Sequence, residues 1–104
     1  YKAAWEFEYA RKLLPRHAEP RNNLGLVLER AGEIEKAIEH YREAVDLAPS
    51  NVEYRGNLAR ALVRNSEQTD ELRELLEYLI EHDTRAAWLI WAKQRLAGFE
   101  HEQE

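Results

Sequence analysis

Apolar residues recur along this chain at helical spacing, interrupted by short breaks. Residues 19–31 carry Leu24, Val27 and Leu28 at the i, i+3, i+4 positions of a half-buried helix. Gly32 follows, and glycine readily adopts the left-handed conformation that closes a helix. Residues 33–48 carry a second stripe, formed by Ala37, Ile38, Tyr41, Ala44, Val45 and Leu47. Pro49 prevents its continuation, so the pattern predicts two helices joined by a tight turn.

The pattern repeats with a period of 34 residues. A shift of this length pairs seven identical residues: Glu19/Glu53, Arg21/Arg55, Asn23/Asn57, Leu24/Leu58, Leu28/Leu62, Arg30/Arg64 and Glu33/Glu67. The opposite shift places Ala37, Ala44, Leu47 and Pro49 on Ala3, Ala10, Leu13 and Pro15. A fixed period in this range indicates a solenoid of stacked supersecondary units.

The unit resembles the tetratricopeptide repeat, whose marks here are Leu24-Gly25, then Ala37, Tyr41, Ala44 and Pro49. Arg21 and Arg55 stand where the family usually has tryptophan. The resemblance implies an all-α fold: a right-handed α-solenoid of antiparallel helix pairs, with about six helices.

The repeat divides the chain into five segments. Residues 1–17 are expected to be the second helix of a truncated repeat, 18–51 a complete repeat and 52–84 a divergent one. Residues 85–98 resemble the first helix of a further repeat or a capping helix, which Gly98 would end, and 99–104 form an acidic tail. Ser50 with Glu53 predicts a capping box for a helix over 51–64. Leucines at 72, 76 and 79 replace the family's small residues, which predicts an altered packing of the helix over 70–82.

Composition excludes several classes of function. The 104 residues are 44% hydrophobic and 34% charged, as expected of one helical domain. No apolar run approaches the roughly 18 residues of a membrane span, and a net charge of −5 argues against a nucleic-acid partner. The chain has no cysteine, which excludes thiolate chemistry without fixing a compartment. Its opening in mid-pattern, without methionine, suggests a piece of a longer protein.

The residue pattern contains no catalytic constellation. The four histidines (His17, His40, His82 and His101) are scattered, without a partner at metal-ligand spacing on one helix face. The glycines are single, so there is no phosphate-binding loop. We therefore expect no catalytic residue, no cofactor and no metal, and a chain that is not an enzyme by itself.

The resemblance implies that the first helices line a concave groove that binds an extended partner peptide. The candidates are Asn22, Asn23, Leu26, Arg30, Asn57, Arg60, Arg64, Ile90 and Lys93. Asn23 and Asn57 share a register and would pair with a peptide backbone. Alternatively, they bond to a neighbouring helix. The basic members would accept acidic side chains or a terminal carboxylate.

Two other roles remain open. Aromatic residues concentrate near both ends of the repeat array: Trp5 and Tyr9, then Trp88, Trp91 and Phe99. They favour self-association into homo-oligomers, because unfinished solenoid ends expose apolar surface. Alternatively, the chain is the recruiting arm of a larger enzyme or regulator. In every case the expected partner is a protein.

Overall fold

A computed structural model describes residues 17–102 and shows five α-helices in that range. They are α2 (Ala18–Arg30), α3 (Ile34–Leu47), α4 (Val52–Arg64), α5 (Asp70–His82) and α6 (Ala86–Glu102). The described part contains no strand, so the all-α prediction is confirmed. The helix expected before residue 17 lies outside the described residues, as do Trp5 and Tyr9.

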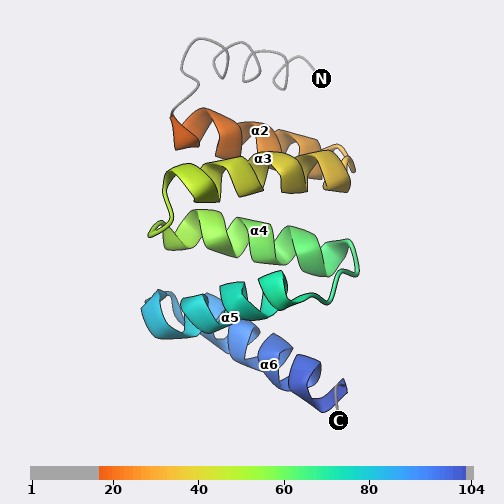
Figure 1. Ribbon diagram of the computed structural model, residues 1–104, viewed down its shortest axis with the longest axis vertical. Coiled ribbons are helices and arrows are strands. Elements are labelled where there is room, and N and C mark those ends of the chain that lie inside the picture. Colours follow the sequence, from red (N-terminus) through yellow and green to blue (C-terminus); the bar gives the residue numbers. More distant parts are fainter. Residues whose placement is uncertain (1–16, 103–104) are drawn as a thin grey trace.

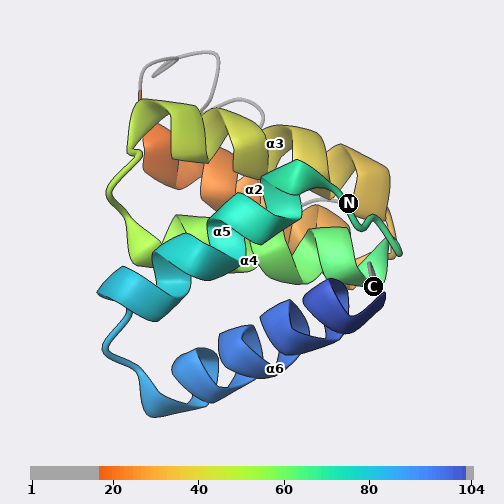
Figure 2. The ribbon, with the colours of Figure 1, turned by 60° about the horizontal axis from the view of Figure 1, so that its bottom comes forward.

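The helices stack in chain order (Figure 1). Each packs against the next, and α2 also contacts α4 across the pair boundary. The loops alternate between the two sides of the stack, so successive helices run antiparallel. In Figure 2 the last helix, α6, lies below α5 and α4. Helices α2 and α4 are each the first helix of a pair. Their contact therefore brings the first helices of successive pairs together.

The α2–α3 pair is closed by one aromatic side chain. Tyr41 is fully buried, together with Leu24, Ala37 and Ala44. A methyl group at Gly25 would lie 2.5 Å from an edge atom of the Tyr41 ring. Gly25 therefore has to lack a side chain, because the ring occupies that space.

The turns after α2 and α4 are built alike, although their sequences differ. Gly32 has φ +85° and Ser66, 34 residues on, has φ +56°. The amides of Glu33 and Glu67 each donate to a leucine carbonyl one turn back, at 2.9 and 3.0 Å. Both turns thus close as Schellman motifs, and Ser66 adopts a backbone conformation that favours glycine.

The divergent pair keeps its buried stripe. Leu72, Leu76 and Leu79 are at most 4% exposed, as the leucine pattern predicts. In Figure 1, α5 and especially α6 are tilted relative to the upper helices. On the outer side, Arg42 of α3 donates twice to Glu71 of α5, at 2.7 and 3.0 Å. The larger core residues and this ion pair accompany the tilt, and an altered packing angle or spacing of α5 stays a prediction.

The start of α4 differs from the predicted capping box. Asn51, and not Ser50, is the N-cap residue, and its Oδ1 accepts a 3.0 Å hydrogen bond from the Tyr54 amide. Ser50 lies in the preceding turn. Asparagine and serine are comparable caps, so the sequence motif placed the cap one residue early.

The predicted end of the last helix at Gly98 is wrong, because α6 continues to Glu102. Phe99 is 2% exposed and its ring centroid lies 4.7 Å from the Arg73 guanidinium. Burying a phenylalanine stabilises a fold by about 1.5–3 kcal/mol, whereas a glycine inside a helix costs about 1 kcal/mol. Burial of Phe99 therefore outweighs the glycine, and the expected acidic tail begins as helix.

Two helical glycines should respond oppositely to alanine. Gly25→Ala should lower the free energy of unfolding by about 1–3 kcal/mol, because the methyl group collides with Tyr41. Gly98→Ala, where a methyl group would meet no atom within 4 Å, should raise it by up to about 1 kcal/mol. Urea unfolding followed by circular dichroism measures both. Equal effects would contradict the close approach of α2 and α3 at Tyr41.

Candidate functional site

A buried carboxylate joins the first three described helices. Glu29 of α2 is 4% exposed. It accepts a 2.6 Å hydrogen bond from the Tyr41 hydroxyl of α3. From α4, Arg60 donates through Nη2 at 2.6 Å and Nε at 3.0 Å, and Arg64 donates through Nη1 at 2.8 Å. One carboxylate thus fixes the relative position of α2, α3 and α4.

The charges of this network decide its protonation. Burial by itself raises the pKa of Glu29, but hydrogen bonds from Arg60, Tyr41 and Arg64 outweigh burial and lower that pKa to about 2. Burial and the bond to Glu29 raise the pKa of the Tyr41 hydroxyl. Glu29 is therefore an anion and Tyr41 a neutral donor at physiological pH.

Of the two asparagines that share a register, Asn23 and Asn57, the second bonds Asn22 across α2 and α4. Asn57 Nδ2 donates to Asn22 Oδ1 at 3.0 Å, and Asn57 Oδ1 accepts from Arg60 at 3.1 Å. Asn22 is 6% exposed, whereas Asn23 is half-buried. Asn57 therefore bonds a neighbouring helix, which is the alternative that the sequence left open. Contact of Asn23 or Asn57 with a peptide backbone stays a prediction.

Four of the predicted groove residues line one depression together with Glu29. This arginine hollow, of about 260 Å³, lies between α2 and α4 and is lined by Leu26, Glu29, Arg30, Arg60 and Arg64. Arg30 is exposed, and the Arg64 side chain is 51% exposed. The predicted residues of α6, Ile90 and Lys93, are also exposed but do not line it.

A second depression lies on the other side of α4. This tryptophan hollow, of about 230 Å³, is lined by Arg60 of α4 and by Ala87, Trp88 and Trp91 of α6. Arg60 lines both hollows. The two therefore adjoin along the face formed by α2, α4 and α6, which we call the first-helix face.

The aromatic residues of α6 pack largely within their own chain. Trp88 and Trp91 are half-buried, meet edge to face at 5.6 Å and pack against the hydrophobic core. Phe99 is buried. The described self-association candidates thus expose less apolar surface than the sequence suggests, and Ile90, at 58% exposure, is the most exposed large hydrophobic residue of the described part.

The described side chains, at residues 17–99, include no group of three or more His, Asp or Glu residues that could bind a metal. Among the helices that the structure describes, none is both long and apolar enough to cross a membrane.

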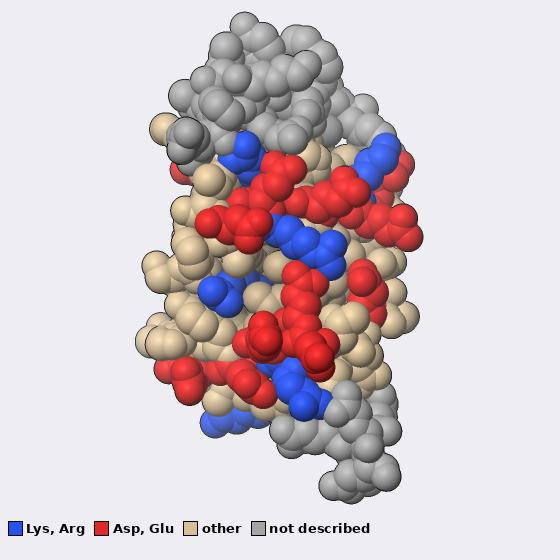
Figure 3. Space-filling view, in the orientation of Figure 1, with Lys and Arg blue, Asp and Glu red and all other residues tan. Residues whose placement is uncertain are grey.

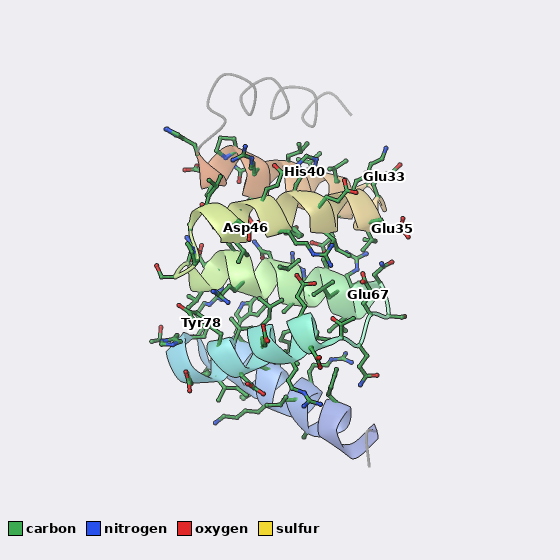
Figure 4. All side chains as sticks on the ribbon, in the orientation of Figure 1. Glu33, Glu35, His40, Asp46, Glu67 and Tyr78 are labelled. Carbon is green, nitrogen blue, oxygen red and sulfur yellow. The ribbon has the colours of Figure 1, made fainter. Side chains whose placement is uncertain are left out.

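His82 lies beside Tyr78, with ring centroids 4.2 Å apart. Figure 4 shows Tyr78 near the interface of α4 and α5, where the Arg55 guanidinium lies 4.0 Å from its ring centroid. These contacts are explained by helix packing.

The sequence analysis did not identify Glu29 as a buried network residue, although the repeat pattern contains an indication of it. The 34-residue shift pairs Glu29 with Val63, an apolar residue packed against the core. A carboxylate at a position that is apolar in the next repeat indicates a side chain facing other helices. Arg60 and Arg64, one turn apart on the next first helix, were its available partners.

The Glu29 network predicts acid sensitivity. The folded pKa of about 2 lies below the ordinary value of 4.5, so its stabilisation is complete above about pH 4.5 and disappears as pH falls toward 2. The shift corresponds to roughly 3 kcal/mol. Glu29→Gln should lose stability of this order at pH 7 and flatten the acid limb, measured by urea unfolding across pH. Glu39→Gln, on the exposed side of α3, is the control and should change neither.

The family model of the tetratricopeptide repeat matches residues 18–51, which hold α2, α3 and the turn after them. Comparison with curated proteins finds no significant match. Tetratricopeptide repeats are generally protein–protein interaction motifs. Residues 18–51 are thus a tetratricopeptide repeat, and further helices stack against this unit in the same antiparallel manner.

Proposed function

We propose that this chain is a protein-interaction module that binds an extended segment of a partner along the first-helix face. The observation that carries the proposal is the continuity of the two hollows. Side chains from three helices that are not consecutive in the chain, α2, α4 and α6, meet at Arg60. A surface assembled in this way follows the stack and suits a linear ligand.

The volumes support a peptide ligand. Binding sites for whole small molecules are typically about 300–1,000 Å³. The hollows are about 260 and 230 Å³ and open to the surface, so each suits a single side chain. A chain of residues can place one side chain in each hollow while its backbone crosses α4.

The distribution of charge supports the same face. Helix α3 carries four acidic and two basic residues, and α5 carries five acidic and one basic. Figure 3 shows acidic side chains gathered over α3 and α5, and Figure 4 labels Glu35 and Asp46 among those of α3. In contrast, two of the three arginines of α4, Arg60 and Arg64, line the arginine hollow, whereas Arg55 lies against Tyr78 of α5. A ligand with acidic residues is repelled by the α3–α5 side and attracted to the first-helix face.

Self-association is the weaker alternative. It finds support in Ile90, which is 58% exposed on α6. However, Trp88 and Trp91 are half-buried and Phe99 is buried within the chain. Among the described residues of α6, this leaves Ile90 as the exposed large hydrophobic side chain.

A peptide-display screen on the purified chain tests the proposal. Arg30→Glu reverses an exposed charge that lines the arginine hollow, and it should weaken binding of selected peptides by about tenfold or more. Lys36→Glu makes the same change on the exposed side of α3 and should leave affinity within about twofold. Affinities are measured by fluorescence anisotropy. Equal effects of the two variants would place binding elsewhere on the molecule.

A further inference from the structure

The tryptophan hollow has an apolar wall that is held in place before any ligand arrives. A methyl group at Gly56 of α4 would lie 2.9 Å from the Trp88 ring, so Trp88 sits directly on the α4 backbone. Trp91 meets it edge to face. Because both indoles are half-buried, their exposed surfaces form a fixed floor for an apolar group.

The turn before α6 also fixes Trp88. Asp83 is 5% exposed and accepts hydrogen bonds from Arg85 through the backbone amide, Nε and Nη2, at 2.9, 2.9 and 2.6 Å. The Arg85 guanidinium lies 4.6 Å from the Trp88 ring centroid. These contacts tie the indole to the α5–α6 turn, which lowers the cost of ordering the site on binding.

The adjoining arginine hollow carries excess positive charge. Three guanidiniums line it (Arg30, Arg60 and Arg64), with Glu29 as the carboxylate among its lining residues. The Glu29 oxygens bond Arg60 and Arg64, and Arg30 is exposed. The charges leave a net positive hollow that complements an acidic side chain.

Together these features specify a two-part ligand. We propose that the tryptophan hollow binds an aromatic or branched apolar side chain of a partner segment whose acidic side chain, three residues away, occupies the arginine hollow. This inference rests on the proposed function and adds the chemistry and spacing of the ligand.

The spacing follows from the geometry of packed helices. The hollows lie on opposite sides of α4, and packed helix axes are about 8–10 Å apart. A polyproline II segment has three residues per turn and a rise of about 3.1 Å, so residues i and i+3 point the same way about 9 Å apart. In a strand, same-side residues are about 7 or 13 Å apart. The i, i+3 spacing fits the separation best.

A series of short labelled peptides tests the spacing. Each carries one Glu and one Phe in a neutral spacer, separated by two, three or four positions, in both chain directions, and is titrated by anisotropy. The i, i+3 peptide should bind most tightly in one direction, and replacing its Phe by Ser should weaken binding by about tenfold. Affinity independent of spacing, or unchanged on loss of Phe, would overturn the inference.

A variant that fills the hollow tests its location. Ala87 is exposed and lines the tryptophan hollow, so Ala87→Trp should fold normally and block entry. It should weaken the Phe peptide by about tenfold and leave the Ser peptide nearly unchanged. Ala97→Trp is the matched control, since Ala97 is exposed on the same helix and does not line the hollow. Equal affinities of the two variants for the Phe peptide would overturn the assignment.

The outcomes separate this inference from the proposed function. If Arg30→Glu weakens all peptides while Ala87→Trp weakens none, the first-helix face binds ligand and the apolar subsite is wrong. If no peptide binds, both fail. Light scattering of the chain without peptide tests whether a second copy of the chain occupies the tryptophan hollow. A dimer that Ala87→Trp abolishes would assign the hollow to that second copy and overturn the peptide inference.

Discussion

A buried carboxylate needs donors for its oxygens, and Glu29 obtains them only when three helices are assembled. Its partners come from α3 (Tyr41) and α4 (Arg60 and Arg64). A carboxylate left buried without these donors would cost several kcal/mol. The requirement therefore couples the packing of the first pair to the position of the next first helix. It also draws two arginines onto the first-helix face, where the candidate site lies.

Arg60 has a double role that follows from this constraint. Two of its nitrogens bond Glu29 and a third bonds Asn57. Its guanidinium also lies 5.9 Å from the Trp88 ring centroid. The side chain is thus held in one orientation by contacts with α2 and α4, and it forms the wall between the arginine and tryptophan hollows. The need to pair the buried Glu29 carboxylate, and not ligand binding, accounts for the position of Arg60.

The divergent second pair shapes the other half of the site. Leucines replace small residues in α5, and the Arg42–Glu71 contact ties α5 to α3. Helix α6 then meets α4 through Trp88 at Gly56, because a glycine at this point leaves room for the indole. An apolar depression, lined by Trp88 and Trp91 of α6, thereby lies beside the basic one. A strictly regular repetition of residues 18–51 would have placed an asparagine, and not a glycine, at position 56.

The sequence by itself determined the helical class, the period, the tetratricopeptide repeat of residues 18–51 and the buried stripes, because these depend on local periodicity and on Gly and Pro at the breaks. It also placed Arg30, Arg60 and Arg64 on one face, since a fixed period repeats direction. Tertiary structure decided what those side chains contact. Glu29, Asn22 and Phe99 are buried by residues 10 or more positions away in the chain. Helical periodicity specifies the direction of a side chain from its own helix, whereas partners and burial depend on the neighbouring helix that packs against it.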